Sequence, residues 1–161
     1  MQFQSLFKAA VDRPVKVALI GAGEFGLSLI AQSRAMRGLE VVAVVDTRLE
    51  AVEKKLASNR VPARRVSTAA EAKAAIAAGD MALASSAAAV MVPPVEMIIE
   101  ATGEPEWAAR HALAAIGAGI GVTMVSKETE CVVGPVLAAR ARKAGVPYAL
   151  VDGDQPALLV Q

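Results

Sequence analysis

The feature that most constrains the fold is a glycine-rich turn between an apolar run and a helix-forming segment. The run at residues 15–20, apolar except for Lys16, is typical of a buried strand. Gly21-Ala22-Gly23-Glu24-Phe25-Gly26 follows it, and the apolar residues beyond have helical spacing. A second apolar run at residues 41–45 leads to Asp46, twenty residues past Gly26. Strand, turn, helix and acid in this order are the pattern of a dinucleotide-binding βαβ unit.

Each glycine of the turn has a separate predicted role. Gly21 permits the tight turn out of the strand, Gly23 lets the backbone approach a pyrophosphate, and Gly26 lets the helix pack closely on the sheet. The pyrophosphate is expected on free amide groups at the helix N-terminus, so Glu24 and Phe25 are predicted cofactor-binding residues too. The alternative is a glycine-rich turn of a doubly wound sheet that binds no ligand.

The acid after the second strand bears on which dinucleotide binds. Asp46 is expected to accept hydrogen bonds from the adenosine ribose hydroxyls, and its charge would repel a 2′-phosphate. This chemistry favours NAD. Arg48 could accommodate that phosphate if Asp46 swings aside, which leaves NADP as the alternative.

The rest of the chain alternates apolar strands with helical segments. Further strands are expected at residues 81–84, 95–99, 121–125 and 147–151, and helices at residues 2–11, 48–58, 67–78, 105–117 and 133–144. Ser85-Ser86 is expected to cap a short helix, and residues 59–66 to form a connection. The alternation predicts a Rossmann-type α/β fold, a doubly wound parallel sheet of about six strands with helices on both faces.

Composition excludes several classes of function. The 161 residues fit one dinucleotide-binding domain over residues 1–161, and a net charge of +1 argues against nucleic acid or an anionic membrane as partner. The apolar stretch 81–95 is shorter than the roughly 20 residues of a membrane span and contains Pro93-Pro94. Cys131 is the only cysteine, so no internal disulfide can form and a reducing cytoplasm is the expected location.

Segments further along the chain resemble a known family. Residues 98–103, 122–127, Gly134-Pro135 and 153–156 resemble the cofactor domain of homoserine dehydrogenase-like oxidoreductases. The closer similarity is to the bacterial branch with the deoxyxylulose phosphate reductoisomerase-like and SAF-domain-containing enzymes. The resemblance implies that Ala101, Thr102 and Gly103 contact the cofactor ribose. It also implies that Lys127 lies near the nicotinamide and substrate as the catalytic residue, although the family's preceding asparagine is Ser126 here.

The resemblance implies an NAD(P)-dependent oxidoreductase acting on a small polar carbonyl or hydroxyl substrate. The family's remaining substrate-binding residues come from a downstream region, and this sequence stops at Gln161. We therefore expect the cofactor domain of a longer enzyme, inactive alone, or else a short relative without the second half. The apolar tail at residues 158–160 is expected to promote homo-oligomers. Two other hypotheses are a nucleotide-sensing regulatory module and a partner subunit that kept the fold but binds nothing.

A few single residues allow both a functional and a structural interpretation. His111 stands one helical turn after Trp107, which favours stacking or exposure over catalysis. One histidine and one cysteine in different elements do not make a metal site. Cys131 is expected to be a small packed residue, and Glu128 and Glu130 to be solvated charges.

Overall fold

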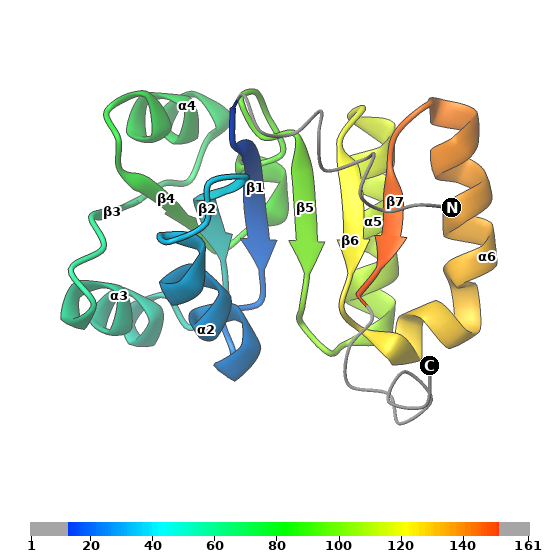
Figure 1. Ribbon diagram of the computed structural model, residues 1–161, viewed down its shortest axis with the longest axis horizontal. Helices are drawn as coiled ribbons and strands as arrows, with labels where there is room; N and C mark the ends of the chain where they lie inside the picture. Colours follow the sequence, from blue (N-terminus) through cyan, green and yellow to red (C-terminus); the bar gives the residue numbers. More distant parts are fainter. Residues whose placement is uncertain (1–12, 152–161) are drawn as a thin grey trace.

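The sheet of the computed structural model, which describes residues 13–151, contains seven strands in the order β3-β4-β2-β1-β5-β6-β7 (Figure 1). Every neighbouring pair is parallel. The strands are β1 (Val15–Ile20), β2 (Leu39–Val45), β3 (Ala63–Arg65), β4 (Met81–Ala84), β5 (Met97–Glu100), β6 (Gly121–Met124) and β7 (Tyr148–Leu150).

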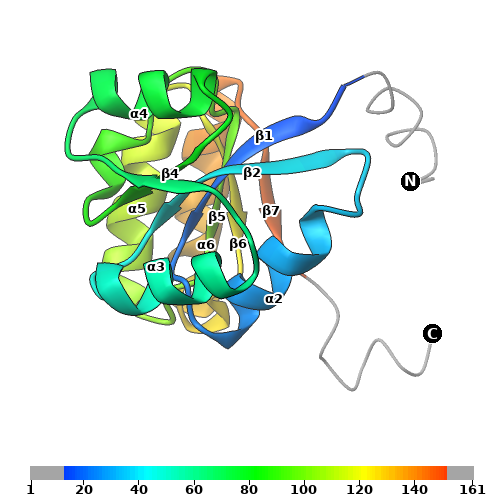
Figure 2. The same cartoon turned by 90° about the vertical axis from the view of Figure 1, so that its left-hand side faces the viewer.

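Helices cover both faces of this sheet because β1, β2, β4 and β5 distribute their buried side chains between two apolar clusters. In β1, Val17 and Leu19 belong to one cluster, while Ala18 and Ile20 belong to the other. The first cluster packs against α2 (Glu24–Ser33) and α3 (Leu49–Ser58). The second packs against α4 (Ala69–Ala77), α5 (Pro105–Gly117) and α6 (Lys127–Ala144). In Figure 2 the strands run between α2 on one side and α4 and α5 on the other.

The strand order creates a topological switch at the centre of the sheet. The chain leaves β1 through α2 toward one edge and leaves β5 through α5 toward the opposite edge. These two strands are neighbours, and Ile20 pairs with Glu100 where both strands end. Ligands of open α/β sheets bind outside the carboxyl ends of the strands at such a switch.

The predicted fold class is confirmed, and the strand count differs by one. The extra strand, β3, lies inside the segment expected to be a connection. Its three residues pair only with β4 at the sheet edge, and two of them are exposed arginines. The sequence of β3 therefore contains no apolar run from which a strand could be predicted. The predicted helix at residues 2–11 and the segment at residues 153–156 lie outside the described residues.

Local signals placed most helix ends correctly. Thr68 caps α4 in a reciprocal capping box with Glu71, Pro105 opens α5, and Gly145 ends α6 in the left-handed conformation. The start of α6 is the main correction. The helix begins at Lys127 rather than near residue 133, because the Ser126 side chain accepts a hydrogen bond from the Thr129 amide. None of the helices within residues 13–151 is long and apolar enough to cross a membrane.

Candidate functional site

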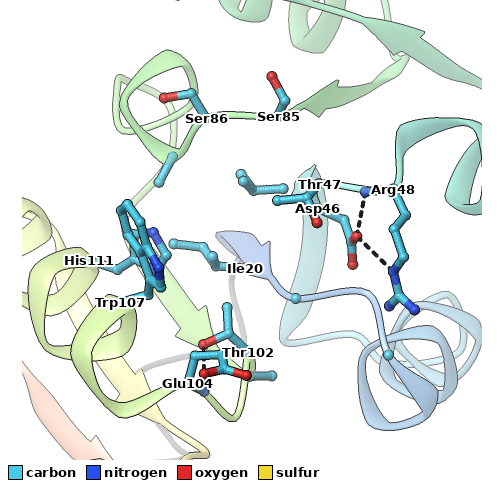
Figure 3. Close-up of a pocket in the computed structure, with 15 residues that line it drawn as sticks. Ile20, Asp46, Thr47, Arg48, Ser85, Ser86, Thr102, Glu104, Trp107 and His111 are labelled. Carbon is cyan, nitrogen blue, oxygen red and sulfur yellow. Dashed lines mark hydrogen bonds and ion pairs between the residues drawn. The ribbon is translucent and has the colours of Figure 1, made fainter.

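A cavity of about 550 Å³ opens at the carboxyl ends of the central strands, beside the switch point (Figure 3). Its walls come from the ends of β1, β2, β4 and β5 and from the first turns of α5. The lining residues are Ile20, Gly21, Gly23, Val45, Asp46, Thr47, Arg48, Ser85, Ser86, Ala87, Ala101, Thr102, Glu104, Trp107 and His111.

The glycines of the turn differ in what surrounds them. Gly21 has a positive φ of 97°, and a Cβ there would lie 2.6 Å from the carbonyl oxygen of Ala101. A Cβ on Gly26 would overlap the carbonyl oxygen of Gly21. A Cβ on Gly23 would meet nothing within 4 Å. Two glycines are therefore required by packing, whereas Gly23 keeps open a space that borders the cavity.

The helix that follows the turn begins without a side-chain cap. Gly23 occupies the N-cap position of α2, and among residues 13–151 no side chain accepts a hydrogen bond from the amides of the first turn. Uncapped amide groups and the helix dipole together favour an anion at this end. Because Gly23 also lines the cavity, this end of the cavity is suited to a phosphate group.

Asp46 stands next to that helix end as a nearly buried carboxylate, with 7% of its side chain exposed. Its Oδ2 accepts a hydrogen bond of 2.9 Å from the Ala22 amide, and its Oδ1 accepts one of 2.8 Å from the Arg48 amide. Burial raises the pKa of Asp46, but the two amides and the Arg48 guanidinium outweigh it and hold the pKa below its ordinary value. Asp46 is therefore an ionised acceptor fixed to the glycine turn.

The wall across from Asp46 is aromatic (Figure 3). The rings of Trp107 and His111, one helical turn apart on α5, stack with centroids 6.1 Å apart and planes inclined by 30°. The Arg110 guanidinium lies 5.3 Å from the Trp107 ring centroid. The predicted stacking of His111 on Trp107 is thus confirmed.

Beneath this wall lies Glu100, a fully buried acid at the end of β5. Its Oε1 accepts a hydrogen bond of 2.7 Å from the Thr102 hydroxyl and lies 3.2 Å from His111 Nδ1. Its Oε2 has no hydrogen-bond partner among the described residues. Sequence reasoning did not single out Glu100, because an acid ending an apolar strand has no local signal of its partners.

The structure gathers most of the predicted cofactor-binding residues. Gly21, Gly23, Asp46, Arg48, Ala101 and Thr102 all line the cavity. Gly26 lies directly beneath the turn, while Glu24, Phe25 and Gly103 are not among the lining residues. Lys127 follows β6 as the first residue of α6 and does not line the cavity either.

Several lining residues were missed as parts of a site. Ser85 and Ser86 were expected only to cap a helix, and although Ser86 precedes the short 3₁₀ helix Ala87–Ala89, its side chain makes no capping bond. Their position directly after β4 is the signal that could have placed them in the site, because β4 pairs with β2 and Asp46 follows β2. The expectation for Cys131 was wrong, because this residue is exposed on α6. Across residues 13–151, no three histidine, cysteine or acidic side chains gather as metal ligands would.

Comparison with known proteins identifies the fold. No protein-family model matches the sequence, and none of the curated proteins is significantly similar to it. Among solved structures, a homoserine dehydrogenase from Thiobacillus denitrificans matches 86% of this chain with a TM-score of 0.61 and 22% identity. A biliverdin reductase from Synechocystis sp. PCC 6803, in complex with biliverdin and NADP⁺, matches 85% with a TM-score of 0.64 and 18% identity. GenD2 from gentamicin A biosynthesis, in complex with NAD, matches 87% with a TM-score of 0.62 and 22% identity.

These structural neighbours are oxidoreductases that share the fold of this chain, and no particular branch among them is singled out. The chain spans 29% of the homoserine dehydrogenase, 37% of the biliverdin reductase and 35% of GenD2. The likeness therefore covers roughly a third of each of these longer proteins.

The glycine environments predict an order of stability for alanine variants. Gly26→Ala and Gly21→Ala force backbone atoms apart, so each should lower the free energy of unfolding by about 1–3 kcal/mol or more. Gly23→Ala adds a methyl group to open space at an N-cap and should cost about 1 kcal/mol or less. Urea denaturation of the three variants measures this order, and a Gly23 variant less stable than the Gly26 variant would contradict it.

Proposed function

We propose that this chain is the cofactor-binding domain of an oxidoreductase and that its cavity binds a nicotinamide dinucleotide. One observation carries the proposal. The open space at Gly23, the uncapped start of α2 and the ionised Asp46 border a single cavity at the topological switch. One bound molecule would therefore be recognised in this cavity at its phosphate, its sugar and its base. The neighbouring structures in complex with NAD and NADP⁺ support the same conclusion.

The residues present fit the two halves of an ADP group. The pyrophosphate would lie against Gly23 and the first turn of α2, where no side chain caps the helix. An ionised carboxylate offers about four acceptor positions, and the amides of Ala22 and Arg48 with the Arg48 Nε use three of those on Asp46. The remaining position, on Oδ2, is available for a ribose hydroxyl.

The same geometry favours NAD over NADP. Asp46 is ionised and held by the backbone of the turn, so it cannot easily move away from a 2′-phosphate. Arg48 is the counterargument, because 70% of its side chain is exposed and it could reach such a phosphate. We propose NAD as the preferred cofactor because the carboxylate is nearly buried and held by two backbone amides, whereas the guanidinium is mostly exposed.

The proposed reaction belongs to a larger protein than the part described. When bound, the nicotinamide would supply the hydride donor or acceptor for a small polar carbonyl or hydroxyl substrate. This chain would hold the cofactor. Lys127, which follows the carboxyl end of β6, would contact the substrate, as the resemblance of the sequence to homoserine dehydrogenases implies. A second domain would hold the substrate in near-attack geometry, so we propose that the chain alone turns over nothing.

A nucleotide-sensing module is the second candidate, and one observation favours it. The cavity is lined by residues suited to binding, and Lys127 is not among them. Both candidates bind the dinucleotide, so affinity does not separate them. A reading frame that continues into a second domain would support the enzyme, whereas a stop codon after Gln161 would support the module.

Binding through the glycine turn is tested with matched variants. Gly23→Val places side-chain atoms in the space proposed for the pyrophosphate, and its Cβ meets no protein atom within 4 Å, so it should abolish NAD binding while the chain stays folded. Gly38→Val is the control, because its Cβ also meets nothing within 4 Å and Gly38 lies before β2, at the opposite end of the strands. Calorimetry with NAD and NADP should show binding to the wild type and the control only. Folded wild-type protein that binds neither cofactor would disprove the proposed function.

Cofactor preference is tested by removing the charge of Asp46. Asp46→Asn keeps the shape of the side chain and removes the repulsion of a 2′-phosphate. The ratio of NADP affinity to NAD affinity should therefore rise roughly tenfold, about 1.4 kcal/mol. Asp80→Asn is the control, since Asp80 pairs with Arg64 outside the cavity. Competitive titration measures the ratios, and tighter binding of NADP to the wild type would show that Arg48 outweighs Asp46.

A further inference from the structure

The pair of Glu100 and His111 performs no task in the binding of phosphate or ribose described above. Glu100 is fully buried, and its carboxylate contacts the side chains of Thr102 and His111. Both of these partners line the cavity, whereas Glu100 itself does not. Burying an acid is costly unless its hydrogen bonds are well placed. Glu100 therefore fixes, from behind, the orientation of two side chains that face a ligand.

The contact with Glu100 also decides which nitrogen of His111 carries the proton. A carboxylate oxygen accepts hydrogen bonds, so the 3.2 Å contact between Nδ1 and Oε1 is satisfied by the tautomer of the ring in which Nδ1 carries the proton. The Nε2 atom is then an acceptor. Since Nδ1 is engaged with Glu100 while the ring lines the cavity, Nε2 is the nitrogen that remains for a ligand.

The position of His111 in the cavity indicates which part of the ligand it meets. With the pyrophosphate at Gly23 and the ribose at Asp46, the base is the remaining part of the ADP half. Figure 3 shows the cavity continuing from Asp46 and Thr47 past Ser85 and Ser86 to the aromatic wall of Trp107 and His111. The Trp107 ring of this wall is a surface on which a purine can stack, which leaves the ring edge of His111 to hydrogen-bond with it.

We infer that His111, oriented by Glu100, reads the purine of the dinucleotide by accepting a hydrogen bond from the 6-amino group of adenine. This inference rests on the proposed function and deepens it. Adenine presents a donor at this position, whereas hypoxanthine presents a carbonyl oxygen that would face the lone pair of Nε2. The site therefore selects adenine over hypoxanthine, and Glu100 is the positioning residue that enforces the selective tautomer.

The experiment compares NAD with nicotinamide hypoxanthine dinucleotide by calorimetry. The wild-type chain should bind NAD about tenfold or more tightly. His111→Phe keeps an aromatic ring and removes the acceptor, so the affinity ratio should fall close to one. Glu100→Gln allows the other tautomer, because an amide can donate to Nδ1, and should also lower the ratio. Glu53→Gln is the matched control. Glu53, on α3, pairs with Arg65 outside the cavity, so this variant should keep the wild-type affinity ratio.

The tautomer gives a second readout that a merely structural role would not change. His111 is the only histidine of the chain, so its ring ¹⁵N signals are unambiguous. They should show a protonated Nδ1 in the wild type and a changed tautomer in Glu100→Gln. Equal affinity of the wild type for the two dinucleotides, or an unchanged ratio in folded His111→Phe, would overturn this inference alone. Absence of binding to both would overturn the proposed function and this inference with it.

Discussion

The close contact between the turn after β1 and the end of β5 is the constraint on which the site depends. Gly21 lies so near the Ala101 carbonyl that no side chain fits between them, and Gly26 lies equally close beneath Gly21. This packing holds the start of α2 against the turn, and the turn against the end of β5. The third glycine, Gly23, is free of such contacts, so we propose that its missing side chain serves the ligand rather than the fold.

Two buried acids, Asp46 after β2 and Glu100 at the end of β5, lie on either side of β1 at the carboxyl ends of the sheet. Asp46 accepts hydrogen bonds from the backbone amides of Ala22 and Arg48 and keeps one acceptor position on Oδ2, which we propose for the ribose. Glu100 is held by two side chains and acts through them on the opposite wall. A buried carboxylate needs strong hydrogen-bond donors, and these donors fix the surrounding groups in turn. We therefore propose that the same physical requirement makes Asp46 a direct ligand contact and Glu100 a positioning group.

The parts of this account that were predictable from sequence are those with local causes. The turn, the helix caps at Thr68 and Gly145, and the place of Asp46 follow from spacing and backbone preference. Strand β3 was not predictable, because an edge strand of three residues has no apolar pattern. The contact of His111 with Glu100, eleven residues apart, depends on how α5 crosses β5. Ser85 enters the site only because β4 lies beside β2, a fact of topology rather than of local sequence.

The central claim is that this cavity holds a nicotinamide dinucleotide with its pyrophosphate on the glycine turn. A crystal structure of the chain grown with NAD tests it most directly. The account predicts electron density for the pyrophosphate at Gly23 and the first turn of α2, with the adenosine ribose within hydrogen-bond distance of Asp46. Density for NAD at another surface, or a bound pyrophosphate that avoids the glycine turn, would contradict it.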